Sequence, residues 1–72
     1  LMQAGQLAAA TRVFELNVES YPNSFNVYDS LAEAYMTAGD DERAIEYYRR
    51  SLEINPGNTN ATQMIDKIRS GD

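Results

Sequence analysis

The stretch FNVYDSLAEAYMTAGDDERAIEYYRRSLEINPGN, residues 25–58, decides the fold, because its pattern recurs in the sequence on either side of it. The recurrence has a fixed offset of 34 residues, which separates Pro22 from Pro56. The other matched pairs are Gly5 and Gly39, Ala10 and Ala44, Phe14 and Tyr48, Val18 and Leu52, Glu19 and Glu53, Asn26 and Asn60, and Leu31 and Ile65. A period of roughly 20 to 50 residues is typical of a solenoid, in which each unit buries its apolar face by stacking on the next.

Helices are expected wherever apolar residues recur at spacings of three and four in segments free of Gly and Pro. This pattern predicts helices over 6–20, 25–38, 41–54 and 59–70, after a stub at 1–4 that Gly5 ends. Residues 21–24 and 55–58 each contain a proline, which cannot continue a helix. Gly39 suits the left-handed residue that closes a helix. The expected N-caps are Asn23 or Ser24, Asp40, and Asn58. The short connections predict antiparallel neighbouring helices.

Composition excludes several function classes. The 72 residues form one small domain without cysteine or histidine, so disulfides, the commonest metal ligand and the usual general base are absent. The net charge is −5 and the six basic residues are scattered, which argues against nucleic acid and anionic lipid surfaces. The apolar stretches are too short to span a membrane. No cofactor is expected, since no phosphate-binding glycine loop is present.

The chain begins with the 34-residue pattern already under way, so we expect it to be a piece of a longer protein. Any targeting segment would then lie upstream. The sequence leaves the compartment open, and a bacterial cytoplasm or periplasm would be compatible with it.

One family has this pattern. Eight residues follow, in order and spacing, its aromatic-x2-Leu-small-x2-Tyr, Ala-x3-aromatic and Pro positions, namely Tyr28, Leu31, Ala32, Tyr35, Gly39, Ala44, Tyr48 and Pro56. The chain resembles the tetratricopeptide repeat family. The resemblance implies an all-α fold of antiparallel helix–turn–helix repeats, stacked as a short right-handed α-solenoid. It further implies that 1–24 end a preceding repeat, that 25–58 form a complete repeat, and that 59–72 form a capping helix.

The expected repeat core follows from the same resemblance. Small residues at Ala32 and Ala44 would let two helices approach closely where they cross. The full expected core is Ala10, Phe14, Tyr28, Leu31, Ala32, Tyr35, Ala44, Tyr48, Leu52 and Pro56. Ser51 departs from the family's usual alanine, but it is small enough to fit. Asp66 and Arg69 put charge where the next crossing would lie, so we expect a polar outer face on the last helix.

The resemblance also implies a concave binding groove, lined by Asn26, Asp29, Ser30, Glu33, Thr37, Asn60, Gln63 and Lys67. Asp29 and Glu33 could in principle serve as an acid–base pair, but a solvated or groove-lining face is the better interpretation. A subclass of the family binds acidic peptides through basic residues at such places. Because Asp29 and Glu33 carry the opposite charge, a neutral or basic peptide is the expected partner.

The remaining candidates have structural interpretations. Of the central tyrosines, Tyr28, Tyr35 and Tyr48 fall on core positions, and Tyr47 is expected to face outward. Arg49 and Arg50 are expected to pair with glutamates on their own helix, a weak interaction at an exposed site.

The leading hypothesis is therefore a non-catalytic protein–protein interaction or assembly module. Its stripe of Leu7, Val13, Phe14 and Leu16 is expected to stay partly open and to favour self-association through helix 6–20. The alternative is that the chain is the C-terminal tail of a larger bacterial enzyme, such as a serine hydrolase of the β-lactamase or esterase type. The sequence upstream would separate the two readings.

Overall fold

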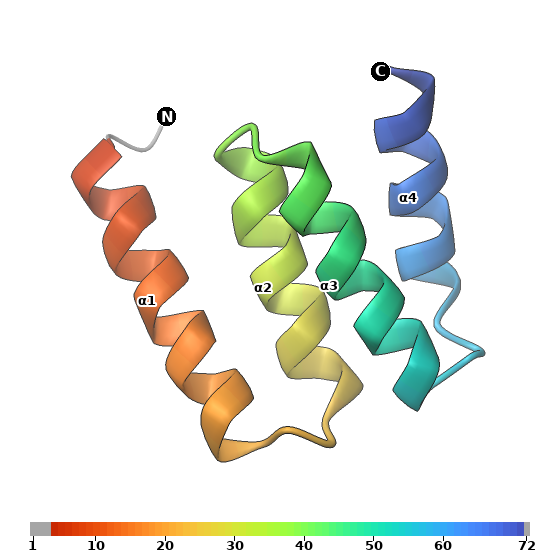
Figure 1. The fold of residues 1–72 in the computed structure, drawn as a ribbon, viewed down its shortest axis with the longest axis horizontal. Helices are drawn as coiled ribbons and strands as arrows, with labels where there is room; N and C mark the ends of the chain where they lie inside the picture. Colours follow the sequence, from red (N-terminus) through yellow and green to blue (C-terminus); the bar gives the residue numbers. More distant parts are fainter. Residues whose placement is uncertain (1–3, 72) are drawn as a thin grey trace.

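Four α-helices follow one another along the chain in the computed structural model, which describes residues 4–71 and their side chains from residue 9 onward. They are α1 (Ala4–Ser20), α2 (Phe25–Thr37), α3 (Asp41–Ile54) and α4 (Thr59–Ser70). The helices stand side by side, and the connections alternate between the two ends, so neighbours are antiparallel (Figure 1). The part of the chain described contains no strand. The predicted all-α fold is confirmed.

Helix boundaries follow the turn chemistry of the sequence. Gly39 has a φ of 85°, in the left-handed region, and follows the end of α2. The Asp40 side chain then accepts a hydrogen bond from the Arg43 backbone N–H at 3.2 Å, which caps α3 as predicted. Ser24 occupies the N-cap of α2, but its side chain makes no capping bond there. That part of the cap prediction is wrong.

The first helix is longer than its sequence suggested. Gly5 was expected to end a stub, but it lies inside α1, which begins at Ala4. One glycine weakens a helix by about 1 kcal/mol relative to alanine and does not by itself break it. The rest of the expected stub, residues 1–3, lies outside the described residues, as does the side chain of Leu7.

The core forms where α2 crosses α3. Ala32 and Ala44 are fully buried on the two helices, and Leu31 and Tyr48 fill the space around them. The larger cluster is completed by Tyr35, Ala61 and Ile65. Small residues permit this close approach, because a larger side chain would have to displace close-packed neighbours. Two alanines therefore lie at the crossing, with larger apolar side chains packed around them.

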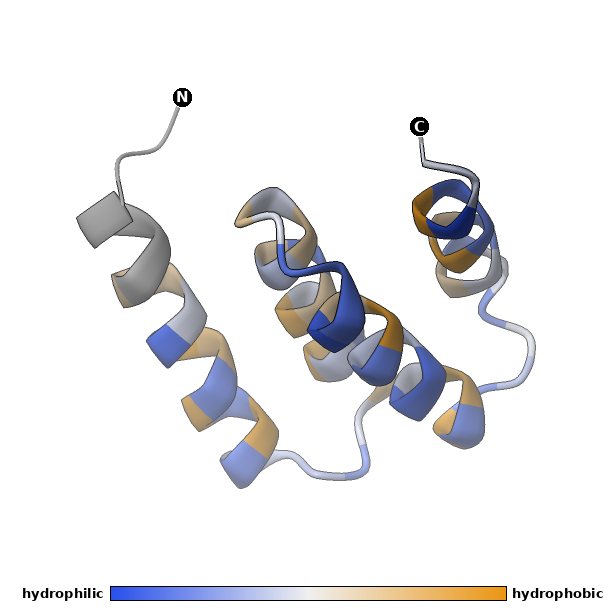
Figure 2. Cartoon of the chain, turned by 45° about the horizontal axis from the view of Figure 1, so that its top comes forward, coloured by the Kyte–Doolittle hydropathy of each residue, from blue (hydrophilic) through white to orange (hydrophobic). Residues whose placement is uncertain are grey.

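The outer part of the expected core is less enclosed. Phe14 and Leu52 are half-buried and pack against the cluster, and Ala10 is half-buried on α1. Pro56 is exposed in the turn after α3, so placing it in the core was wrong. Its contribution is to end α3, since it cannot supply a helical N–H. Figure 2 shows hydrophilic residues covering much of the visible face of α3 and alternating with hydrophobic ones along α1.

The helices form two layers. Asp29 on α2 accepts hydrogen bonds from Asn60 on α4, so α2 and α4 share one face of the molecule. On the other side, Glu15 and Val18 of α1 line a depression of about 200 Å³ together with Tyr47 of α3. The surface formed by α2 and α4, called here the α2–α4 surface, includes Asp29 and Asn60, two of the expected groove residues.

Candidate functional site

A buried polar network joins three helices beneath the α2–α4 surface. The Ser51 hydroxyl, which is fully buried, donates to the Phe25 carbonyl oxygen at 3.0 Å. The Asn58 amide nitrogen donates to the same Ser51 oxygen at 2.8 Å, while its oxygen accepts from the Ala61 N–H at 3.4 Å and caps α4. Among the described residues no buried side-chain polar atom lacks a partner. Ser51 therefore replaces the family's alanine with a bond that ties α3 to the start of α2.

Asp29 extends this network to the surface. One carboxylate oxygen accepts from the Asn58 amide at 3.2 Å and from the Asn60 amide at 3.3 Å. The other oxygen accepts from Asn60 at 3.1 Å. These bonds hold the carboxylate in place, and they bring together Asp29 and Asn60, two residues that the family resemblance placed in one groove.

Glu33 lies one helical turn after Asp29 on α2, and it is exposed. Its backbone carbonyl accepts from the Thr37 hydroxyl at 3.0 Å, so Thr37 is bonded to its own helix. The ion pairs among the described residues join Arg43 to Asp40 and Arg50 to Glu46, and neither involves Asp29 or Glu33. Of the other expected groove residues, Ser30 is half-buried and the rest are exposed, namely Asn26, Gln63 and Lys67.

Tyr48 adds a hydroxyl that the sequence analysis treated only as part of a core ring. Its side chain is 1% exposed, and it makes no hydrogen bond to any described residue. Burial, followed by the nearby charges of Asp29 and Glu33, raises the pKa of Tyr48 to about 12. The hydroxyl is therefore neutral at physiological pH. The sequence did contain a signal for this hydroxyl, because the equivalent position of the preceding repeat is Phe14, which has none.

Tyr47 was expected to face outward, and that prediction is wrong. Its ring stacks between those of Tyr35 and Tyr28, at centroid distances of 5.5 and 6.4 Å. Arg50 lies over the Tyr47 ring at 5.8 Å. Burial, followed by the neighbouring Tyr35 and Glu46, raises the pKa of Tyr47, and Arg50 partly opposes this shift. The column covers the seam between α2 and α3 on the side of α1, so Tyr47 stabilises the fold and offers no stacking platform.

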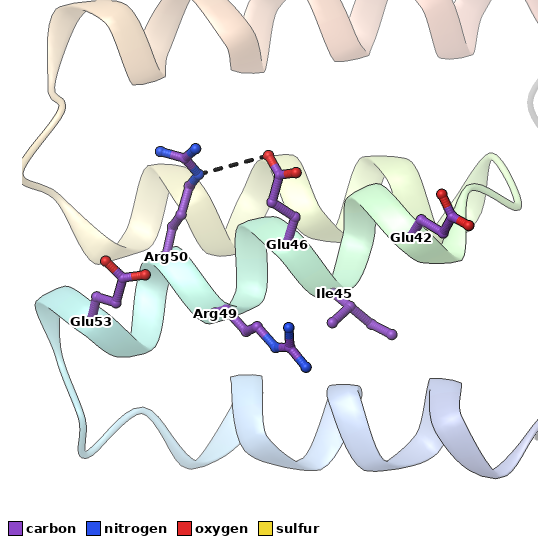
Figure 3. A pocket seen from close by; sticks show the side chains of 6 residues that line it. All are labelled: Glu42, Ile45, Glu46, Arg49, Arg50 and Glu53. Atoms are coloured by element: carbon purple, nitrogen blue, oxygen red, sulfur yellow. Dashed lines mark ion pairs between the residues drawn. The ribbon is translucent and has the colours of Figure 1, made fainter.

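The outward face of α3 carries mixed charge. Figure 3 shows Arg50 and Glu46 pointing towards α1, and Arg49 and Ile45 towards α4. The Arg50–Glu46 pair is 3.8 Å long and largely exposed, as expected for Arg50. Glu42 and Glu53 complete the lining of an open depression of about 540 Å³. The lining combines three glutamates with two arginines, so charges of both signs are present on this face.

Two kinds of site are not found in the residues that the structure describes. No group of three or more His, Cys, Asp or Glu side chains is placed to hold a metal ion. No helix within residues 4–71 is both long and apolar enough to cross a bilayer.

The helices are paired, antiparallel and arranged in two layers. This arrangement defines the class of fold as a helical solenoid. A family model described as tetratricopeptide repeat matches residues 25–58. The chain is also 31% identical to the human superkiller complex protein 3 over 55 residues. The matched segment makes up 76% of this chain and 4% of the human protein. The chain therefore carries a repeat of the tetratricopeptide family. Repeats of this family generally mediate protein–protein interaction.

Proposed function

We propose that this chain is a non-catalytic docking module that binds a peptide segment of a partner protein on its α2–α4 surface. The observation that carries the proposal is the Asp29–Asn60 contact, which ties the exposed faces of α2 and α4 into one continuous polar surface. A surface held by a buried network is preorganised, so less ordering entropy is lost when a peptide binds.

The charge of this surface supports a neutral or basic partner. Asp29 and Glu33 lie one turn apart on α2 without an ion pair among the described residues. Lys67 contributes one positive charge on α4. The eight residues expected to line the groove therefore carry a net charge of about −1. Like charges across an interface cost several kcal/mol, so an acidic peptide would be disfavoured.

The test is a selection of random display peptides on the immobilised chain. We expect the retained peptides to be neutral or positively charged. Glu33→Ala should reduce their retention without lowering the melting temperature, because Glu33 is exposed and lies outside the core. Glu42→Ala, at an exposed position of α3, is the matched control and should bind like the parent. Enrichment of acidic peptides, or equal retention by the Glu33 variant, would overturn the proposal.

We also propose that the ends of the chain follow the repeat pattern, with 1–24 closing a preceding unit and 59–72 capping the stack. Support for the cap comes from α4, where Ala61 and Ile65 are buried while Asp66 and Arg69 are exposed.

A second copy of the chain is a further candidate partner, and a separate observation favours it. Val13 and Leu16 on α1 are 55% and 44% exposed, although both are large and apolar. Their pairing with the same side chains of a second copy would remove this surface from water.

A further inference from the structure

The exposed residues of α1 form one ordered stripe along the helix. This helix stands at one end of the row of helices (Figure 1). From residue 9 onward its exposed positions are 9, 12, 13, 16, 19 and 20. Spacings of three and four residues place these positions on one side of a helix, called here the α1 outer face. Val13 and Leu16, which are 55% and 44% exposed, occupy its middle.

This stripe has the order of a helix-pairing seam with a charged edge. Positions 9, 13, 16 and 20 alternate spacings of four and three residues, as the central positions of paired helices do. Arg12 and Glu19 lie seven residues apart, so both flank the seam on the same edge. The ion pairs among the described residues lie within residues 40–50 and include neither of them. Two opposite charges are therefore available to a partner helix.

The order of the four residues fits a second copy of the chain in the antiparallel orientation. If Val13 lies opposite Leu16 of the second copy, Leu16 lies opposite its Val13, as two-fold symmetry requires. Arg12 is then level with position 17 of the second copy, about 3 Å of helix rise from its Glu19. A long arginine side chain spans that offset, and the same pair recurs on the other side of the axis.

A parallel pair would leave these charges without opposite partners. Arg12 would be level with Arg12 of the second copy, and the residue that flanks the seam beside it would be the uncharged Asn17. Complementary charges at the edge of a seam set partner choice and orientation more than affinity. The α1 outer face carries both members of the complementary pair, so a second copy matches it in charge as well as in apolar contact.

We propose that two copies of this chain pair antiparallel through the α1 outer face, with Arg12 of each copy bound to Glu19 of the other. Val13 and Leu16 form the apolar centre of the contact. The proposal rests on the proposed self-association, to which it adds an orientation and a selectivity.

A charge exchange tests the ion pairs, with dissociation constants measured by sedimentation equilibrium of the 72-residue chain. Arg12→Glu places acidic side chains together at both flanks, and Glu19→Arg places basic ones together. Each variant alone should self-associate about tenfold more weakly than the parent, since like charges replace both ion pairs. An equimolar mixture of the two should associate about as tightly as the parent, because each flank again joins opposite charges. Arg69→Glu, an equal change of net charge at an exposed position of α4, should behave like the parent.

Disulfide formation tests the orientation, because the natural chain contains no cysteine. Ala9→Cys and Ser20→Cys both change exposed positions of α1. In the antiparallel pair position 9 lies opposite position 20, whereas two copies of either position are roughly 16 Å apart along the helix, too far for a disulfide. In a glutathione buffer the mixture should therefore form the mixed disulfide, and neither variant alone should form a covalent dimer.

The outcomes separate this pairing from self-association as such. A parent chain that stays monomeric would overturn both. If the parent self-associates but Arg12→Glu does so equally, or if Ala9→Cys alone forms the disulfide, the antiparallel pairing is overturned and self-association stands. Association restored in the charge mixture, together with the mixed disulfide, would establish the pairing. A melting curve for each variant shows that the fold is retained, and the display selection reports on peptide docking independently.

Discussion

At the scale of single residues, the tight crossing of α2 and α3 depends on Ala44. This side chain is fully buried within the cluster that contains Ala32 and Tyr48. Ala44→Arg would force a long cation into that space, so we expect destabilisation of at least about 3 kcal/mol in chemical denaturation. Glu53→Arg places the same side chain at an exposed position of α3 and should cost little. If Ala44→Arg melted like the parent, the packing described here would be incorrect.

Ser51 provides a second prediction at this scale. Its hydroxyl donates to the Phe25 carbonyl oxygen and accepts from the Asn58 amide. Ser51→Ala should cost about 1–2 kcal/mol of unfolding free energy, because buried groups lose partners. A double-mutant cycle with Asn58→Ala should give a coupling energy above about 0.5 kcal/mol, as is usual for residues in one network. Strictly additive losses would show that the bond between them contributes nothing.

Titration of Tyr48 predicts how stability depends on alkaline pH. The folded-state pKa of about 12 lies above the ordinary tyrosine value of 10.0. Between these values the unfolded chain has lost the phenolic proton while the folded chain retains it, so stability must fall as pH rises. The contribution of Tyr48 to stability should be fully present below about pH 10 and should be lost as the pH rises towards about 12. Tyr48→Phe should remove most of this fall, measured as the difference between unfolding free energies at pH 9 and pH 11.5. An unchanged slope in the variant would assign the effect to other groups.

At the scale of elements, the aromatic column fastens α3 to α2. Tyr47 stacks between Tyr28 and Tyr35, and Arg43 lies over the Tyr35 ring at 5.6 Å. Tyr47→Ala should therefore destabilise the chain by about 2 kcal/mol, since it removes half-buried apolar area and two ring contacts. Tyr21→Ala is the control, because Tyr21 is exposed in the first turn. Equal melting temperatures for the two variants would rule out a stabilising column.

The helices and the crossing of α2 and α3 could be predicted from the sequence. A stripe of apolar residues fixes which segments are helical, and the period of 34 residues restricts how these helices can be arranged. The predicted limits of α3 and α4 agree with the structure. Gly5 could not be placed, because a glycine is compatible with both a turn and a helix interior. Tyr47 was misplaced for a related reason: it is adjacent to the core residue Tyr48, and helical spacing alone did not show that α2 would cover it.

The candidate site was less predictable than the fold. The residues of the α2–α4 surface came from family resemblance, and the structure brings Asp29 and Asn60 into contact. The Ser51–Asn58 bond was missed, because it depends on the approach of groups from different segments of the chain. Pairwise contacts of this kind are not encoded in the periodicity of one helix.

At the scale of the whole molecule, the two layers differ in what they offer a partner. The α2–α4 surface is polar and held by a buried network, whereas α1 exposes Val13 and Leu16. The proposed peptide docking and the proposed self-association would therefore use different surfaces. A variant that changes one should therefore leave the other intact, provided that the fold is maintained.

Self-association through α1 is the prediction that belongs to this scale. Burying a large apolar side chain contributes about 1.5–3 kcal/mol, so four such side chains across a symmetric contact could support a weak dimer. We expect the sedimentation coefficient of the parent chain to rise with concentration, and Leu16→Glu to abolish the rise, because it places charge in the contact. Glu53→Gln, an exposed change on α3, should leave it unaltered. Leu16→Glu should also still retain the display-selected peptides, since the proposed docking surface lies on α2 and α4. A parent chain that sediments as a monomer at all concentrations would exclude α1 as a self-association surface.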